Sequence, residues 1–187
     1  MVAIAAALGS KSLVSSSLTV SSPSSAASRV DPSPDEPRDA LGEGGGAVPD
    51  GTTVYNDEVP GVANLDPALR GALRRAATDA ADDGVGFFVD SGWRSPEYQE
   101  QLLRDAIAKY GSEQEAARWV ASPDTSAHVS GDAVDIGPSR AAAWLSEHGA
   151  GYGLCQIYGN EPWHYELRPG GCPPMYADPT DDPRMQQ

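Results

Sequence analysis

Two of the three histidines in this chain stand near acidic residues in patterns that favour metal binding. His128 lies seven residues before Asp135, and Gly131 between them lets the chain turn back on itself. His164 follows Glu161 by three residues, at an expected turn. A catalytic zinc site takes three side chains from His, Asp, Glu or Cys and keeps one position open for water. The spacing therefore predicts His128, Asp135 and His164 as metal ligands and leaves Glu161 as a spare carboxylate.

Each of these residues also has an ordinary structural explanation. His128 could hydrogen-bond its own loop, Asp135 could cap a turn, and Glu161 could be an exposed turn carboxylate. The combined pattern is S-x-H-x-x-G-x-A-x-D, followed further along the chain by E-x-W-H. Neither helix nor strand periodicity requires that pattern, so as a whole it indicates a metal centre.

Three helices are expected before the first motif, and each begins at a residue that caps helices well. Their expected ranges are 66–84, 95–111 and 112–122. A short apolar run at 85–89 has the composition of a buried strand. That strand leads into Ser91-Gly92-Trp93-Arg94, so Arg94 is expected at a strand end.

The second half of the chain predicts three more strands and one helix. The strands are expected at 133–136, 154–158 and 163–167, and the helix at 139–148. Alternation along the first of these strands puts Ala133 and Asp135 on one face. Tyr165 and Glu166 alternate after His164, so Glu166 is expected to support the site rather than bind the metal. Helices flanking a small antiparallel sheet make the expected fold α+β.

The acidic composition excludes some classes of partner. The 187 residues carry a formal net charge of -14, whereas binding to nucleic acid or to an anionic membrane needs clustered Lys and Arg. A chain of this length is expected to hold one catalytic domain, which the apolar residues place at 53–176.

The two ends of the chain differ from this domain in composition. Residues 1–28 combine a short apolar start with a Ser-rich stretch, which predicts a partial signal peptide or the remnant of an anchor. Residues 29–52 predict a disordered linker and residues 177–187 a disordered tail. We therefore expect a secreted or extracytoplasmic protein, either released or tethered through its N-terminus. The two cysteines, Cys155 and Cys172, form no C-x-x-C pair, and in an exported protein they are expected to form a disulfide.

At these motifs the chain resembles the VanY-type D-alanyl-D-alanine carboxypeptidases, which are related to the VanX dipeptidases and to the zinc-binding domain of hedgehog proteins. The resemblance runs from Leu65 to about Leu167. It rests on the two motifs above and on S-G-[YW]-R-S, which Ser91–Ser95 match. It implies a hedgehog/DD-peptidase-like fold in which the two motif histidines and the aspartate bind Zn2+.

The resemblance also implies roles for residues around the metal. Glu161 would be the general base, Arg94 would contact the substrate near the reacting carbonyl, and Ser126 would hydrogen-bond it. Attack on an amide needs a base for the proton, and a guanidinium offers forked donors to the oxyanion that forms. Two alternatives stay open: Arg94 could pair with Glu97 on the surface, and Ser126 could only order its loop.

The remaining conspicuous residues have mostly structural interpretations. Trp163 stands next to His164 and is expected to line the substrate site, where its apolar ring lowers the local dielectric. His148 falls near a helix end and is read as a structural residue rather than a fourth ligand. The other tryptophans, Trp93, Trp119 and Trp144, are expected in the core or in the wall of a cleft.

The function expected from these residues is zinc-dependent removal of the terminal D-alanine from peptidoglycan stem peptides. Two related cuts use the same metal motif, namely those of a D-Ala-D-Ala dipeptidase and of an endolysin-like L-Ala-D-Glu endopeptidase. A zinc-binding module without catalysis is a third alternative, which the presence of Glu161 and Arg94 disfavours. No protein partner is implied, and a monomer is expected.

Overall fold

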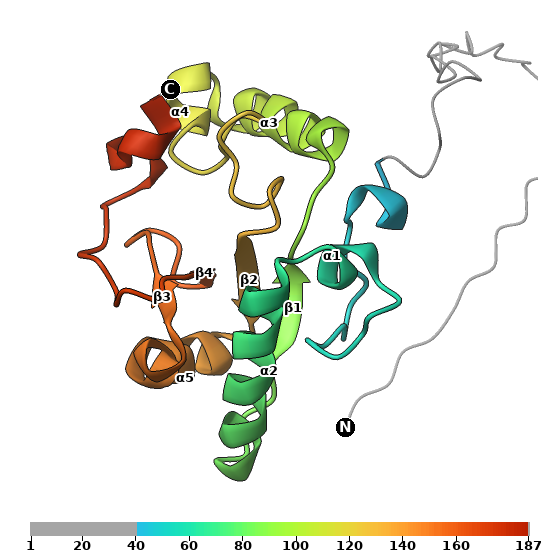
Figure 1. The fold of residues 1–187 in the computed structure, drawn as a ribbon. Helices are drawn as coiled ribbons and strands as arrows, with labels where there is room; N and C mark the ends of the chain where they lie inside the picture. The colour runs from blue at the N-terminus through green and yellow to red at the C-terminus, as the bar shows by residue number, and fades with distance from the viewer. Residues whose placement is uncertain (1–40, 187) are drawn as a thin grey trace, which may run out of the picture. The chain divides into compact units, whose positions relative to one another are not determined.

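A four-stranded antiparallel sheet stands at the centre of the part of the chain that the computed structural model describes, residues 41–186. The strands are β1 Phe88–Ser91, β2 Ala133–Gly137, β3 Leu154–Gln156 and β4 His164–Leu167. Their order across the sheet is β1-β2-β4-β3, so β2 and β4 are central (Figure 1). The expected α+β class is confirmed, and the predicted signal segment at 1–28 lies outside the described residues.

Five helices and four short 3-10 turns surround the sheet within the described residues. The helices are α1 Pro60–Ala63, α2 Pro67–Asp82, α3 Pro96–Tyr110, α4 Glu113–Ala116 and α5 Ser139–His148; the turns are η1 Glu43–Gly45, η2 Gly149–Tyr152, η3 Pro179–Asp181 and η4 Pro183–Gln186. The predicted caps are present, because the Asp66 side chain accepts from two amides of α2 and the Ser95 side chain accepts from Tyr98 N.

The main core lies between one face of the sheet and the helices α2 and α5. The predicted apolar positions of α2, including Leu69 and Leu73, are buried there. Val134 and Ile136 of β2 and Tyr165 of β4 face the same core. Because side chains alternate along a strand, the residues between them point to the other face of the sheet, where the predicted chemistry lies.

Several elements differ from their expected bounds or burial. The strand expected at 154–158 ends at Gln156. The strand expected at 85–89 begins only at Phe88, because Val85 N still bonds Ala80 O and the chain is completing the end of α2. The third helix stops at Ala116 instead of continuing to 122. The apolar face of α3 is only half-buried, since it lines a cleft rather than the core.

The folded unit is longer at both ends than the expected 53–176. Part of the expected linker belongs to it, because Gly45 is buried and its carbonyl accepts from Ser95 N. The expected disordered tail is also folded, with Asp178 and Asp182 buried. Hydrogen bonds and ion pairs hold these two segments, and a sequence poor in apolar residues does not reveal such contacts.

A second, smaller core lies beneath the C-terminal segment. Cys155, Ile157 and Tyr158 form it, and Tyr176 and Met185 pack against it. The expected disulfide between Cys155 and Cys172 is present, with the two Cα atoms 5.3 Å apart. The segment after β4 is thus tied covalently to β3 before it returns across the molecule beside α4 (Figure 1).

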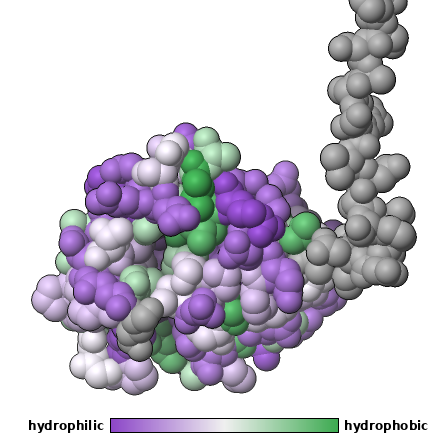
Figure 2. All heavy atoms as spheres, turned by 90° about the horizontal axis from the view of Figure 1, so that it is seen from above, coloured by the Kyte–Doolittle hydropathy of each residue, from purple (hydrophilic) through white to green (hydrophobic). Residues whose placement is uncertain are grey.

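The surface agrees with the acidic composition. On the face shown in Figure 2, hydrophilic residues cover most of the described part, and hydrophobic residues form a narrow strip and scattered spots. Among the helices of residues 41–186, none combines the length and apolar character that crossing a membrane requires.

Candidate active site

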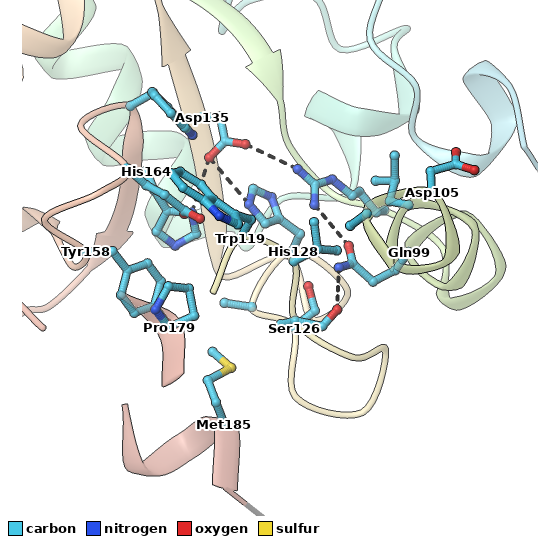
Figure 3. A pocket seen from close by; sticks show the side chains of 18 of the residues that line it. Gln99, Asp105, Trp119, Ser126, His128, Asp135, Tyr158, His164, Pro179 and Met185 are labelled. Carbon is cyan, nitrogen blue, oxygen red and sulfur yellow. Dashed lines mark hydrogen bonds and ion pairs between the residues drawn. The ribbon is translucent and has the colours of Figure 1, made fainter. Parts of the chain in front are cut away.

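The three predicted ligands meet on the face of the sheet opposite the core. Asp135 Oδ1 lies 3.2 Å from His164 Nδ1 and 3.5 Å from His128 Nε2. One ligand atom from each residue fits within a set whose members all lie within 4.8 Å of one another. Figure 3 shows the Asp135 carboxylate between the two imidazoles. Two nitrogens and a carboxylate oxygen form a donor set that suits zinc.

The sheet itself brings two of these residues together. Asp135 and His164 are directly opposite each other in the register of β2 and β4. Both side chains point away from the core because Val134, Ile136 and Tyr165 occupy the alternate positions.

His128 reaches the same point from a loop. Gly131 closes that loop with a φ of +79°, and its carbonyl accepts from Asp66 N at the start of α2. A Cβ at this position would lie 2.6 Å from the backbone oxygen of Asn64. The position therefore requires glycine, both for its backbone conformation and for the close approach.

A hydrogen bond behind each imidazole turns one nitrogen toward the centre. His128 Nδ1 donates to the carbonyl of Gly92 at 2.8 Å, which leaves Nε2 facing Asp135. His164 Nε2 faces Glu166 Oε1 at 3.3 Å, which leaves Nδ1 facing Asp135. Metal-binding histidines commonly have such a partner, which fixes the orientation of the ring.

The electrostatics of the cluster follow from burial and from the opposite charges in it. Burial alone raises the pKa of Asp135, but the two imidazoles outweigh it and hold that pKa well below its usual range. Burial alone lowers the pKa of His164, but hydrogen bonds to Asp135 and Glu166 outweigh it and raise that pKa to about 9. A metal ion bound at Nδ1 would take the place of a proton there.

Glu161 stands beside the cluster rather than within it. Its Oε2 lies 3.7 Å from His164 Nδ1, and only 7% of the residue is exposed. Burial is the main cause that raises the pKa of Glu161 to about 7. The positive charge of the protonated His164 imidazole opposes this shift, and the negative charge of Asp135 adds to it. A carboxyl group with a pKa near neutrality is suited to taking and returning a proton.

The guanidinium of Arg94 is fixed by three hydrogen bonds. Nε donates to Ser91 Oγ at 2.8 Å, Nη1 to Gln99 Oε1 at 3.0 Å, and Nη2 to Asp135 Oδ2 at 3.2 Å. Arg94 therefore pairs with Asp135, and the alternative of a surface pair with Glu97 is wrong. The side chain is 13% exposed and lines the cleft, so it is both oriented and accessible.

A cleft of about 400 Å3 opens over these residues. Ser126 and Trp163, both expected to bind substrate, line it. Ser126 is buried and Trp163 is 40% exposed. Tyr110 and Trp119 also line the cleft, and their rings stack with centroids 5.9 Å apart. His148 stacks on Trp144 instead, with centroids 4.4 Å apart, as expected for a structural histidine.

Sequence reasoning missed two residues that shape the site. Gln99 is 1% exposed and joins Arg94 to the backbone oxygen of Ala121. The sequence feature that could have revealed Gln99 is a polar amide among the apolar residues on the inner face of an amphipathic helix. Tyr158 packs its ring against His164, with centroids 5.1 Å apart. No spacing in the sequence links these two residues.

Residues 63–169, more than half of the chain, match the family model described as VanY: D-alanyl-D-alanine carboxypeptidase. The chain belongs to the VanY family. A D-alanyl-D-alanine carboxypeptidase of Enterococcus faecalis (strain ATCC 700802 / V583) is 33% identical over 139 residues, covering 59% of this chain and 52% of that protein. The chain thus spans about half the length of this relative.

Solved structures of VanY proteins share the fold. A variant of the vancomycin resistance D,D-pentapeptidase VanY from a VanB-type cassette, in complex with Zn(II), is 30% identical, with a TM-score of 0.52 and coverage of 55% of this chain and 72% of that one. VanYB in complex with D-Alanine-D-Alanine is also 30% identical, with a TM-score of 0.53 and coverage of 55% and 71%. The LdcB LD-carboxypeptidase has the same fold, with a TM-score of 0.53, 22% identity and coverage of 64% and 66%.

Proposed function

We propose that this VanY-family chain is a zinc-dependent D-alanyl-D-alanine carboxypeptidase that releases the terminal D-alanine from peptidoglycan stem peptides. The observation that carries the proposal is the convergence of His128, Asp135 and His164 with Glu161 and Arg94 at one cleft. A non-catalytic module would need the metal ligands but neither the buried carboxyl nor the oriented guanidinium.

The proposed chemistry divides between the metal and the protein. Zinc, when bound by His128, Asp135 and His164, supplies a Lewis acid that lowers the pKa of a water molecule from 15.7 to about 7. Glu161 takes the proton from the attacking water and passes it to the leaving amine of D-alanine. Its place beside the ligands and its raised pKa support this role as general base.

Arg94 is proposed to stabilise the oxyanion that forms when the scissile carbonyl is attacked. The bonds to Ser91, Gln99 and Asp135 hold its guanidinium before the substrate arrives. A donor that is oriented in advance stabilises a developing charge without reorganising during the reaction. Ser126 and Trp163 are proposed to contact the substrate from the cleft wall.

The substrate and the location of the protein rest on different support. The curated relative is named a D-alanyl-D-alanine carboxypeptidase, and VanYB is named in complex with D-Alanine-D-Alanine, which favours this substrate over those of the alternative cuts. The disulfide supports an extracytoplasmic location, because disulfides persist in oxidising compartments. A monomer is proposed for the folded unit.

The test is product analysis by mass spectrometry with three substrates. The zinc-loaded protein is incubated with a stem pentapeptide, with free D-alanyl-D-alanine and with a crosslinked muropeptide, each with and without chelator. We expect loss of one D-alanine from the pentapeptide, and none after the metal is removed. Activity that survives complete zinc removal would overturn the proposed mechanism. Cleavage of the dipeptide alone, or of the crosslinked muropeptide alone, would overturn the proposed substrate.

A further inference from the structure

The C-terminal segment, residues 176–186, reaches the metal centre from outside the range that matches the VanY family. That range ends at residue 169, whereas Arg184 of η4 forms two bonds with Glu166 on β4. Arg184 Nη1 lies 2.8 Å from Glu166 Oε2, and Nη2 lies 3.1 Å from Oε1. The guanidinium therefore forms a bidentate contact with both oxygens of this carboxylate.

Glu166 is the residue that orients His164. It is completely buried, and its Oε1 faces His164 Nε2 at 3.3 Å. A buried carboxylate must be paired, because burying an uncompensated charge is very costly. Its orientation here matters as much as its charge, since rotation of the carboxylate would move the oxygen that holds the imidazole.

Two cations contact Glu166, but they contact it differently. Arg168 pairs with Oε2, the oxygen that does not face His164. Arg184 binds both Oε2 and Oε1, so it alone of these two contacts the oxygen that faces His164. Planar forked donors fix a carboxylate in this way, and a lysine cannot reproduce the geometry.

The same segment supports His164 from a second side. Arg184 also binds Asp182, which is fully buried and accepts from the hydroxyl of Tyr158. The Tyr158 ring packs against His164. The His164 imidazole is thus contacted by Glu166 at Nε2 and by the Tyr158 ring, and Arg184 links these two contacts through Glu166 and Asp182.

We propose that Arg184 is a positioning residue for His164, acting through Glu166, and that the C-terminal segment is therefore part of the metal centre. The inference rests on the proposed function only in taking His164 to bind zinc. It assigns to a segment that lies beyond the matched range the task of setting the angle at which one ligand meets the metal.

The test measures zinc affinity of the full chain by competition with a chromophoric chelator. We expect Arg184→Gln to weaken zinc binding by about 10-fold to 100-fold, the usual effect of removing a partner behind a metal ligand. Arg184→Lys keeps the charge without the fork and should lie between this variant and the wild type. Unchanged affinity in Arg184→Gln would overturn the proposal.

Arg118→Gln is the matched control. Arg118 pairs with Asp178 of the same segment at 2.9 Å and does not line the cleft. Its loss removes an Arg–carboxylate pair that anchors the segment but leaves Glu166 untouched. Zinc affinity should stay within about twofold, since a substitution that shares no partner with Glu166 or His164 acts independently of them. An equal loss of affinity in both variants would show that anchoring matters and would overturn the specific role of Arg184.

A spectroscopic readout separates positioning from folding. In the cobalt-substituted protein, Arg184→Gln and Arg184→Lys should change the ligand-field absorption, and Arg118→Gln should not. If Arg184→Gln fails to fold, Arg184→Lys decides: wild-type affinity and an unchanged cobalt spectrum would overturn the proposal. A wild type that binds zinc but releases no D-alanine would refute the proposed function and leave this comparison valid. A wild type that binds no zinc would refute both.

Discussion

Asp135 is shared among three partners at the centre of the site. Its Oδ1 faces both imidazoles, and its Oδ2 accepts from Arg94. A substitution of Arg94 therefore disturbs a proposed metal ligand as well as the proposed oxyanion contact. Glu161 lies beside the ligands without being one of the three, so it allows a cleaner separation of metal binding from catalysis.

Glu161→Gln should retain zinc and lose turnover. The amide has nearly the shape of the carboxyl group but cannot accept the proton of the attacking water. General-base catalysis contributes about 10²-fold to 10⁴-fold, so kcat should fall by that factor or more. Metal content and rates measured on the same samples check this, with Glu97→Gln on the exposed first turn of α3 as the control. Turnover close to that of the wild type would remove Glu161 as the base.

The same substitution should change how the stability of the metal-free protein depends on pH. The pKa of Glu161 rises from 4.5 to about 7 on folding, so folding favours its protonated form. This contribution is fully present below pH 4.5 and is lost as the pH rises through 7, at a cost of about 3 kcal/mol for a shift of this size.

Glutamine is neutral throughout this range and escapes that cost. The free energy of unfolding of Glu161→Gln minus that of the wild type is therefore expected to change with pH. This difference should be about 3 kcal/mol larger at pH 8 than at pH 4. Denaturant unfolding of both metal-free proteins at the two pH values measures it. A difference between the proteins that does not vary with pH would contradict the expectation.

At the residue scale, the sequence predicted the site residues that lie within short motifs. It did not predict site residues that come together from distant parts of the chain. His128, Asp135 and His164 were found because their spacing is unusual in short stretches of chain. Gln99 and Arg184 were not found, because their partners lie in other elements and only the folded chain brings them together.

At the scale of elements, the loop between His128 and Asp135 depends on one glycine, and this can be tested. Gly131→Ala should lower the free energy of unfolding by more than the roughly 1–2 kcal/mol of left-handed strain, because the new Cβ also meets the Asn64 oxygen. Zinc affinity should fall as well, since relief of the clash moves His128.

Gly84 provides the matched control for that substitution. Its φ is +70°, but a Cβ there meets nothing within 4 Å, and it lies at the end of α2 away from the cleft. Gly84→Ala should therefore show the backbone strain alone, with zinc affinity unchanged. Equal effects of the two substitutions on stability and on zinc would contradict a special role for the loop.

Helices α2 and α5 were predicted more accurately than the strand expected at 85–89, for a physical reason. Caps and 3.6-residue periodicity act over short stretches of chain. The start of α2 at Pro67 follows from the Asp66 cap, and α5 was found at its expected range without a side-chain cap. A strand is defined by its partners. The residues at 85–87 are apolar, but the last hydrogen bonds of α2 take Val85 out of the sheet.

At the scale of the whole molecule, the disulfide joins Cys155 of the second core to Cys172, in the chain between β4 and the C-terminal segment. Replacing Cys155 and Cys172 by alanine should lower the free energy of unfolding by about 3 kcal/mol, as the chain-entropy account gives for a loop of this length. The loop between them spans 17 residues. Denaturant midpoints of the oxidised, reduced and doubly substituted proteins test this, and a reductant should have no effect on the double variant.

The limits of the folded unit were the least predictable feature of the molecule. Composition separates apolar domains from polar linkers, and the segment at 177–186 is rich in Asp and Pro. It is nevertheless folded, since Asp178 pairs with Arg118, Arg184 pairs with Glu166, and Met185 packs against the second core. Such pairing depends on the surface beneath the segment, and composition carries no information about that surface.

The register of β2 and β4 has a consequence for the kinetics of metal exchange. The backbones that carry Asp135 and His164 lie opposite each other in a ladder at the middle of the sheet, so the spacing of these backbones cannot change unless the strands separate. His128 belongs to a loop and can leave without breaking that ladder. An ion held at this site would therefore depart through the loop, and its off-rate would report how often the loop opens rather than how stable the sheet is.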